Sequence, residues 1–374
     1  MIEIKPVCGK RSTRDWLSVP IVTLAHDPNW VQPLNIAEME RLSPKHNPFF
    51  ANGEAVMYVG YKDGKPAGRI SAQVNRSHLE RYQDGTGHFG FFDCINDAEV
   101  AAALTGAARV WLKERKLSRM VGPFGFDINQ DAGLLVSGFE HRPAVMTSHA
   151  NVWTGALLER CGLEKVVDLY AYRMSPHNMP PQITRLAGLA KASGRVKVRN
   201  IDTSRFYEEA ALLFDIFNDA WSDNWGYLPI SEKAGRALAA EVRPVMRSKF
   251  GWIAEIDGKP AAMMVLLPDV NEVIGPFRGR LFPFNWLKLG TAILRDDWRT
   301  ARVIMLGIRK EHRATFGASV LSMMVTNIME LSRQYDIDWV EFSWVVETNR
   351  QMMALAELAA GKPAKTYRLY GCEL

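Results

Sequence analysis

The 374-residue sequence predicts an α/β protein in which one domain, a mixed β-sheet packed with helices, occurs as two tandem copies. The pentapeptide DGKPA is found at 63–67 and again at 257–261. In both places it lies between alternating apolar runs, and Asp-Gly in that position predicts a β-hairpin. A second pair of segments, NVWTGALLER (151–160) and NRQMMALAEL (349–358), shares Asn, Ala, Leu and Glu at an offset of 198 residues. Together the two landmarks indicate an internal duplication.

Each half predicts the same order of elements: strand, helices, hairpin, strand, long helix, strand, helix and strand. The long helix is expected in 97–116 and in 318–334, and the short apolar strand after it in 119–124 and in 338–345. In the second long helix, apolar residues recur at helical spacing and form one face that can pack on a sheet. These residues are Val320, Leu321, Met324, Ile328 and Leu331. The halves end on the strands DLYAYR and KTYRLY, in which Tyr172 and Tyr370 keep the offset of 198.

Two insertions and a connector complete the predicted domain organisation. When the strands of the two halves are matched, about 21 extra residues fall in 123–145 and about 25 in 274–298. Residues 175–195 are rich in Pro, Gly and basic side chains, as a connector between domains is. We therefore expect an N-terminal domain over 1–174 and a C-terminal domain over 196–374. The 123–145 insertion is interpreted as a loop that reaches across to the second half, without an assigned chemistry.

Composition limits the class of protein and of partner. A hydrophobic fraction of 47%, a charged fraction of 23% and a net charge of +5 are typical of a globular protein that binds anionic small molecules or an anionic membrane surface. The sequence has no basic stripe of the kind that binds nucleic acid, so no nucleic-acid partner is expected. The four cysteines form no Cys-x-x-Cys pair, so we expect a reducing compartment and no metal site. The charged N-terminus and the lack of a long uncharged run predict a cytoplasmic protein, with peripheral contact at the inner membrane as an extension.

Four separated motifs carry a resemblance to a known family. They are DPNWVQPL (27–34), PKHNPFF (44–50), GPFGFDINQDAGLLVSGF (122–139) and the pair NRQMMALAEL and KTYRLY near the end of the chain. In order and content they resemble a bacterial family of tandem GNAT-superfamily proteins that includes bacterial ceramide synthases. The resemblance implies two GNAT-like domains and a CoA-dependent N-acyltransferase. It also implies acyl-CoA as co-substrate and a primary amine as acceptor, and a sphingoid-type long-chain base is the narrower expectation.

The resemblance places the acyl-CoA site after the second half's central strand. GNAT proteins follow this strand with Arg/Gln-x-x-Gly-x-Gly/Ala, whose backbone N–H groups hold pyrophosphate at a helix start. Here Arg313 and Ala318 match, whereas Phe316 replaces the first glycine, so we interpret the loop as a diverged phosphate cradle. A plain strand-to-helix turn with a solvated basic cluster is the alternative. The residues expected to bind CoA are Ile308, Arg313, Ala314, Thr315, Phe316, Gly317, Ala318 and Asn349. The matching segment of the first half, 93–104, has aspartates and no glycine, so no CoA is expected there.

Acyl transfer to an amine needs a base for the amine proton and an acid for the leaving thiolate. Glu347, at the end of a predicted strand, is the expected base, with a helix N-terminal acid as the alternative. Tyr367 is the expected acid, because GNAT enzymes often use a tyrosine there; a core tyrosine is the alternative. His312 could act as base or phosphate contact, or be a surface histidine, and Asn349 could simply cap a helix.

The acceptor side and the second insertion complete the sequence-based expectations. Trp221, Trp225 and Tyr227 could line an apolar acceptor groove or pack in the core. Residues 275–298 mix aromatic and basic side chains, which suits either an anionic lipid interface or a lid between the domains. Two other functions stay open: a non-catalytic ligand-binding GNAT-like protein, and an aminoacyl-tRNA-dependent transferase.

Overall fold

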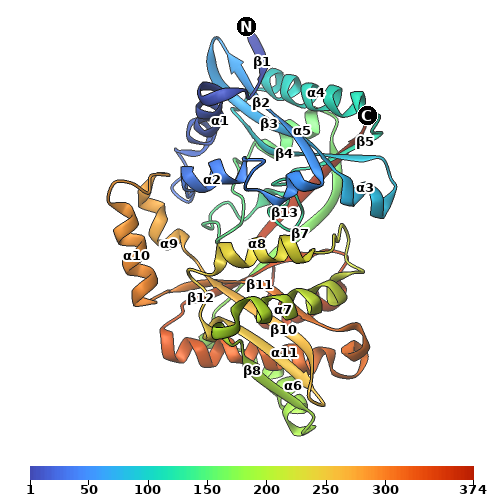
Figure 1. The fold of residues 1–374 in the computed structure, drawn as a ribbon, viewed down its shortest axis with the longest axis vertical. Coiled ribbons are helices and arrows are strands. Elements are labelled where there is room, and N and C mark those ends of the chain that lie inside the picture. Colours follow the sequence, from blue (N-terminus) through green and yellow to red (C-terminus); the bar gives the residue numbers. More distant parts are fainter. The chain divides into compact units, whose positions relative to one another are not determined.

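The computed structural model describes residues 1–374 and separates into two compact units (Figure 1). Unit 1 contains Met1–Leu169, Val273–Trp286 and Lys365–Leu374, and unit 2 contains Tyr170–Glu272 and Leu287–Ala364. Neither unit is continuous in sequence, because the last strand of the chain belongs to unit 1. The units therefore differ from the two sequence halves by exchanged segments.

The sheet of unit 1 has the strand order β1-β2-β3-β4-β5-β13, and β6 pairs with β13. Only β4 and β5 are parallel in this set; the other pairs are antiparallel. The strands are β1 (Ile2–Pro6), β2 (Gly53–Lys62), β3 (Lys65–Asn75), β4 (Thr86–Cys94), β5 (Arg119–Gly122), β6 (Leu134–Ser137) and β13 (Lys365–Glu373). Strand β6 lies in the 123–145 insertion and pairs with β13, a strand that comes from the second half of the sequence.

Helices cover this sheet. They are α1 (Gly9–Leu24), α2 (Asn35–Arg41), α3 (Arg76–Tyr82), α4 (Ala98–Glu114) and α5 (Thr154–Arg160), with a 3-10 turn at Pro48–Ala51. Both α1 and α4 contact β3, which is buried along its length from Ala67 onwards. Because successive residues of a strand point to opposite faces, burial of every residue means that both faces of β3 are covered. Trp16 of α1 is fully buried in this core.

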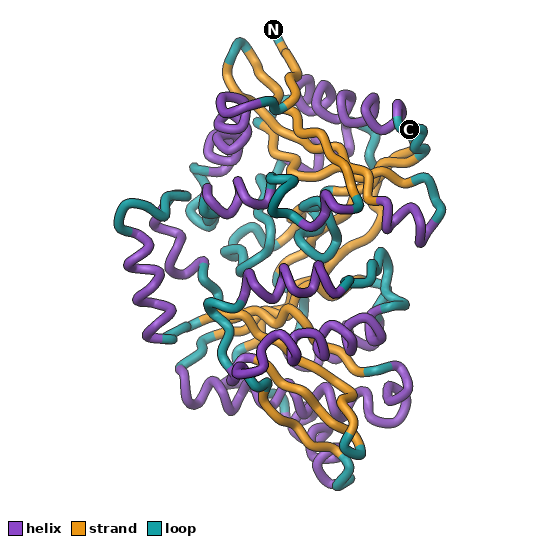
Figure 2. Tube along the Cα trace, viewed as in Figure 1, coloured by secondary structure: helices purple, strands orange, loops and turns teal.

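The sheet of unit 2 has the order β12-β11-β10-β9-β8, with β7 beside β12. Its strands are β8 (Val196–Asn200), β9 (Gly251–Ile256), β10 (Lys259–Pro268), β11 (Thr300–Ile308) and β12 (Trp339–Val346), while β7 (Glu164–Met174) runs from unit 1 into unit 2. Strands β11 and β12 are parallel, and β8 to β11 are antiparallel to their neighbours. The helical secondary structure around these strands is visible in Figure 2.

The helices of unit 2 are α6 (Pro181–Ala192), α7 (Phe206–Trp221), α8 (Glu232–Val242), α11 (Lys310–Tyr335) and α12 (Arg350–Ala360). Helices α9 (Asn271–Ile274) and α10 (Asn285–Arg295) cross the unit boundary along the chain, and 3-10 turns occur at Pro176–Asn178, Thr203–Arg205, Ser248–Phe250 and Gly275–Phe277. In Figure 1, α7 lies in front of β10 and β11, and α11 lies behind them. By length and composition alone α11 could cross a membrane, but it packs on the sheet and on α6.

The segment expected as a connector, 175–195, contains α6. Ile183, Ala187 and Ala190 of this helix are buried, and α6 packs along α11. These three residues are spaced by four and three, which puts them on one helical face. The helical spacing of its apolar residues, rather than its Pro and Gly content, therefore indicates the secondary structure of this segment.

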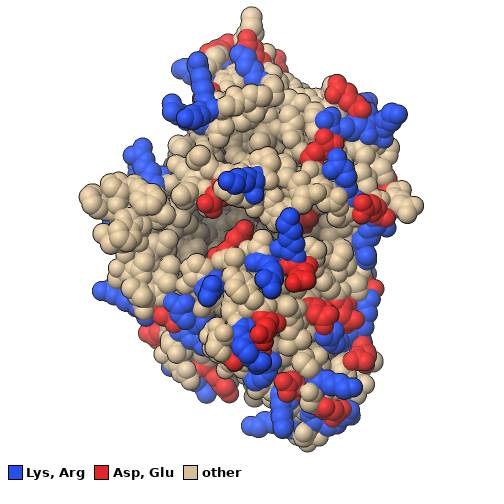
Figure 3. Space-filling model, viewed as in Figure 1, with Lys and Arg blue, Asp and Glu red and all other residues tan.

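The two DGKPA segments form the hairpin turns expected from the sequence. Asp63 and Gly64 have φ of 50° and 76°, and Asp257 and Gly258 have φ of 52° and 78°. Positive φ at both central residues is the geometry of a two-residue hairpin turn, and it explains the Asp-Gly pair. The strands are in register on either side, with Lys62 opposite Lys65 and Ile256 opposite Lys259. Figure 3 shows basic and acidic side chains mixed over most of the face in view.

Candidate functional site

The two parallel strands of unit 2 separate halfway along their length. Strands β11 and β12 pair from Thr300 opposite Trp339 to Val303 opposite Phe342, and the ladder ends there. Both strands continue, β11 to Ile308 and β12 to Val346. At the same point the register between β10 and β11 shifts, which leaves Ile304 as the extra residue of a β-bulge. A bulge bends its strand, so it accounts for the separation and leaves strand edges that an extended ligand can pair with.

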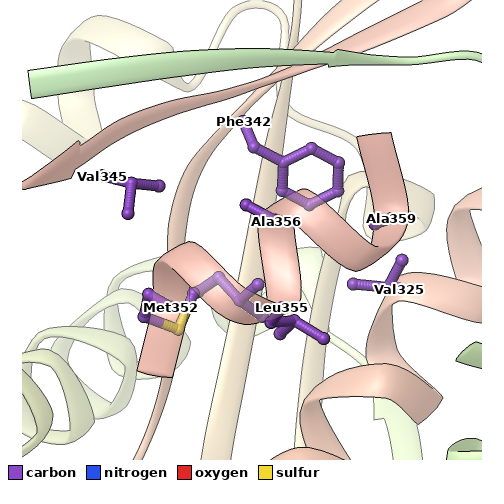
Figure 4. A pocket seen from close by; sticks show the side chains of 8 residues that line it. Val325, Phe342, Val345, Met352, Leu355, Ala356 and Ala359 are labelled. Carbon is purple, nitrogen blue, oxygen red and sulfur yellow. The ribbon is translucent and has the colours of Figure 1, made fainter. Parts of the chain in front are cut away.

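An apolar pocket lies at this separation (Figure 4). Its walls come from both strands, from α11 and from α12. The lining residues are Leu306, Val325, Phe342, Val345, Met352, Leu355, Ala356 and Ala359. No charged side chain lines the pocket, and its free volume of about 10 Å³ has room for about one water-sized molecule. It is a small apolar gap between β11, β12 and the two helices.

A buried polar network lies on β11 and β12 where their pairing ends. Arg302, Glu341 and Ser343 are exposed by only 4%, 0% and 5%. Arg302 donates from Nε to Ser343 Oγ over 2.9 Å and from Nη2 to the Ser343 carbonyl over 3.2 Å. Ser343 Oγ in turn donates to Glu341 Oε1 over 3.0 Å. Burial lowers the pKa of Arg173, while the charge of Glu341 opposes this shift.

The sequence carries a signal for this network that does not depend on any motif. Arg302 and Glu341 each interrupt an otherwise apolar strand, ARVIMLGI or WVEFSWVV. A charge within a strand that is buried on both faces must find a partner, because a lone charge in the interior is costly. The register puts the two residues opposite each other, so the network could have been found by asking where each charge is paired.

The expected phosphate cradle is part of a helix. Ile308 is the last residue of β11, and α11 begins at Lys310, so residues 313–318 form its first turns. Phe316 is 9% exposed, and a Cβ added at Gly317 would meet no atom within 4 Å. Phe316, which replaces the glycine, therefore lies within α11 with its side chain buried. No glycine-rich loop lies between β11 and α11. CoA binding by Arg313 and its neighbours stays a prediction.

Carboxylates of α7 and the turn after it contact the start of α11. The backbone N–H of Lys310 donates to Asp219 over 2.8 Å, and the Lys310 ammonium group lies 2.6 Å from Asp223. Arg309 pairs with Asp215 at 2.5 Å, and Arg313 pairs with Asp223 at 3.6 Å. A helix N-terminus favours anions, and here it is bound by the protein's own acids. A phosphate at this position would have to replace Asp219.

The expected catalytic residues are divided between the units. Glu347 follows β12 and is half-buried, and His312 lies in the first turn of α11, 3.2 Å from Glu311. Asn349 is the N-cap of α12, since its Oδ1 accepts from the Met352 N–H over 3.1 Å. Tyr367 is fully buried in β13, which belongs to unit 1. Unit 2 therefore holds Glu347 and His312, and it does not contain the expected acid.

The three aromatic residues expected on the acceptor side have different environments. Trp221 ends α7 and reaches the separated part of β11, because a Cβ on Gly307 would lie 3.3 Å from its Nε1. Trp225 is half-buried. Tyr227 is 6% exposed, and its hydroxyl donates to Asn218 over 2.9 Å, as a core tyrosine does. Trp221 is thus the one that lies against the strand separation.

Unit 1 has a parallel strand pair in the corresponding place with a different helix start, but β5 ends at Gly122, one residue after its last pairing with β4. Its parallel pair β4 and β5 ends at His88 opposite Val121, and Phe91 has a φ of 50° at a register shift. Asp97 caps α4 by accepting from the N–H groups of Glu99 and Val100 over 2.9 and 3.1 Å. A carboxylate thus takes the amides that an anion would use. The described chain holds no group of three or more His, Cys, Asp or Glu side chains placed to bind a metal ion.

Buried titratable groups lie close to the end of the β4–β5 ladder. Burial lowers the pKa of His88 to about 3 and raises the pKa of Asp127. Asn75 donates to Asp127 over 3.1 Å, and the ring of His88 lies 4.7 Å from that of His78. These groups come partly from the motif at 122–139, so this motif has a structural role in the core of unit 1.

Comparison with known proteins gives two full-length relatives. The chain is 36% identical over 370 residues to Protein YghO of Escherichia coli, which covers 98% of this chain and 94% of the relative. It is 34% identical over 371 residues to a bacterial ceramide synthase of Caulobacter vibrioides, which covers 99% and 97%. No family model matches.

Solved structures share the fold at low identity. A tandem GNAT protein from the clavulanic acid biosynthesis pathway aligns with a TM-score of 0.59 and 14% identity, covering 100% of this chain and 98% of that one. A GCN5-related N-acetyltransferase from Sphaerobacter thermophilus aligns with a TM-score of 0.53 and 11% identity, covering 100% and 95%. These alignments agree with the duplicated α/β architecture.

Proposed function

Because this chain belongs to the tandem GNAT-superfamily proteins that include a bacterial ceramide synthase, we propose that it is an acyl-CoA-dependent N-acyltransferase with its active site in unit 2. The acceptor is a primary amine, and a sphingoid-type long-chain base is the narrower proposal. The relative's name supports the lipid acceptor, and the GNAT fold supports transfer from a CoA thioester to nitrogen.

The separation of β11 and β12 beside an apolar pocket is the observation that supports this proposal best. A thioester donor needs a narrow slot for its extended arm, a hydrogen-bond donor for its carbonyl oxygen and a dry surface for its acyl chain. Unpaired strand edges supply the first two, since a backbone N–H can stabilise the developing oxyanion. Leu306, Phe342 and Met352 line the apolar gap beside them, which an acyl chain would have to widen.

In the proposed acyl transfer, side chains of the protein move the protons and bind the donor. Glu347 or His312 takes a proton from the ammonium form of the acceptor, and the neutral amine attacks the thioester carbon. The tetrahedral intermediate then loses the second proton of its nitrogen to solvent and expels the thiolate as the C–S bond breaks, which leaves the neutral amide. Tyr367 is the residue proposed to donate the proton to sulfur. Arg309, Lys310 and Arg313 would bind the CoA phosphates in exchange for their present partners Asp215, Asp219 and Asp223.

Incubation of the purified chain with acyl-CoAs and candidate amines tests the proposal, with products identified by mass spectrometry. We expect an amide whose formation requires both substrates. No product with any acyl-CoA, together with tight binding of the same molecules, would favour a non-catalytic binding protein. Product formation only from aminoacyl-tRNA would favour the transferase that uses that donor.

Thermal protection by CoA tests the assigned phosphate contacts. We expect CoA to raise the melting temperature of the wild type and to have little effect on Arg313→Glu. Arg236→Glu is the matched control, because Arg236 is an exposed arginine of the same unit that pairs only with surface groups. Equal protection of both variants would contradict the assignment. Calorimetry should find one CoA per chain, since Asp97 occupies the equivalent amides in unit 1.

A further inference from the structure

The turn before α10 and the helix itself expose large apolar side chains. Phe282, Phe284 and Leu294 are 63%, 72% and 85% exposed, and Trp286 and Leu287 are about half exposed at 48% and 49%. No residue of α10 is buried. Isolated exposed apolar residues are common on proteins, but five within thirteen consecutive residues form a patch that calls for a partner.

Local hydrogen bonds hold the aromatic turn in place. The Trp286 N–H donates to the Leu281 carbonyl and its indole N–H donates to the Pro283 carbonyl, both over 2.9 Å. Asn285 donates to the Arg280 carbonyl over 2.7 Å. The turn is therefore ordered while its rings face solvent, so the exposure of the rings is a property of a folded element.

The far end of α10 is also fixed to its own unit. Arg247 donates to the Ile293 carbonyl over 3.1 Å, and Lys249 pairs with Asp296 at 2.7 Å. Leu287, Thr291 and Leu294 are spaced by four and three, so they share the exposed face of the helix. Lys288 and Arg295 each follow a leucine of this face by one residue, which puts cations along one side of it.

The segment carries only positive charge. Between Val273 and Arg295 the sequence contains Arg278, Arg280, Lys288 and Arg295 and no Asp or Glu, and all four cations are exposed. Figure 3 shows a mainly uncharged surface at the position of α10, with basic side chains at its edge. Over the rest of the view the two signs are mixed. The patch therefore combines aromatic rings, leucines and unopposed cations.

We propose that this surface, the α10 surface (residues 278–295), docks the protein on an anionic lipid bilayer. Aromatic rings and leucines enter the boundary between headgroups and acyl chains, and flanking cations contact lipid phosphates. Each cation near an anionic membrane favours binding, so the four together offset the small apolar area. A second copy of the chain is disfavoured as the partner because its own four cations would face these four. This inference does not depend on the proposed acyl transfer.

Flotation of the full chain with vesicles tests the proposal. Vesicles of phosphatidylcholine with and without phosphatidylglycerol should be compared at low and high salt. We expect binding to the anionic vesicles that decreases with salt, and little binding to pure phosphatidylcholine. Removing one surface cation should weaken binding about fivefold, so Lys288→Gln with Arg295→Gln should weaken it roughly 30-fold. Lys197→Gln with Lys233→Gln is the charge-matched control, because both lysines are exposed in the same unit.

A second pair of variants separates the apolar contribution from charge. Leu287→Gln with Leu294→Gln should reduce flotation at least tenfold at constant charge, whereas Leu189→Gln with Val110→Gln should not. The control residues are exposed apolar side chains on other helices, at 61% and 58%. Failure of the wild type to float with anionic vesicles at low salt would overturn the proposal. Equal flotation of the α10 variants and their controls, or a wild-type dimer that the leucine variants dissociate, would overturn it as well.

Discussion

Replacing Ser343 with alanine should destabilise unit 2 more than any other loss of a single hydroxyl there. The Ser343 hydroxyl connects two buried charges, because it accepts from Arg302 Nε over 2.9 Å and donates to Glu341 over 3.0 Å. Each charged partner loses one hydrogen bond in the variant, and a buried hydrogen bond to a charged group contributes about 1.5–3 kcal/mol. The free energy of unfolding should therefore fall by about 3 kcal/mol or more.

Differential scanning calorimetry measures this effect. Unit 2 contains about 180 residues, a size at which 1 kcal/mol shifts Tm by about 2–4 °C. We expect the Tm of Ser343→Ala to fall by roughly 6–12 °C. Ser332→Ala is the matched control, since Ser332 is 1% exposed in the same unit and its hydroxyl donates only to the Met329 carbonyl over 2.8 Å. A neutral hydrogen bond contributes about 1 kcal/mol, so the control should lose only about 2–4 °C.

A double-mutant cycle then shows whether the charges are coupled through the hydroxyl. Glu341→Gln combined with Ser343→Ala should cost less than the sum of the two single changes, because each removes part of the same network. Equal Tm losses for Ser343→Ala and Ser332→Ala would refute the reasoning. Strict additivity in the cycle would refute the coupling while leaving the single contacts in place.

Three further predictions concern other parts of the chain. The pKa of His88 is lowered to about 3, so between about pH 6.5 and 3 this histidine binds a proton when the protein unfolds. The free energy of unfolding should therefore fall by up to about 1.4 kcal/mol for each unit that the pH is lowered. Urea midpoints of His88→Gln should fall less steeply over this range than those of the wild type. Asp97→Ala should destabilise unit 1 by about 1–2 kcal/mol through loss of the α4 cap and leave the affinity for CoA unchanged, as calorimetry would show. Gly307→Val should lower the free energy of unfolding by about 1–3 kcal/mol, because its Cβ would lie 3.3 Å from Trp221. The same change should raise the KM for the amine more than the KM for acyl-CoA. A KM increase for acyl-CoA alone would contradict an acceptor site beside Trp221.

The sequence was sufficient for those parts of the fold that depend on local rules. The Asp-Gly turns need positive φ at two adjacent residues, and both hairpins form where DGKPA predicts them. Val320, Met324 and Ile328 are fully buried, as the helical spacing predicts, although α11 begins at Lys310, eight residues before the expected helix start at 318. The polar start of this helix, KEHRATFG, carries no apolar periodicity, so hydrophobic spacing alone could not reveal it.

Features that depend on long-range pairing were beyond the sequence. Strand β13 follows α12 in the chain, and its pairing with β5 and β6 is decided by which edges are open after folding. In the same way, a loop pattern does not reveal the role of Phe316, because that role depends on the helix that contains it. Arg302 and Glu341 are each a lone charge in their own strand, and only the register pairs them.

The two copies share a parallel strand pair and differ in what binds the N-terminus of the helix that follows its first strand. In unit 1 Asp97 is the residue directly before α4, and its carboxylate accepts hydrogen bonds from the first N–H groups of that helix. The position of the carboxylate is therefore set by the backbone of α4 itself. In unit 2 the Lys310 N–H is bound by Asp219, which comes from a different helix ninety-one residues away. A cap from a separate element can be displaced by moving a side chain, whereas the local cap of α4 can be displaced only by disturbing the helix start. If an anion binds at either copy, this difference favours the second, and Asp219→Asn should then tighten CoA binding by removing the competing charge. An unchanged or weaker affinity of this variant would show that the phosphates are bound elsewhere.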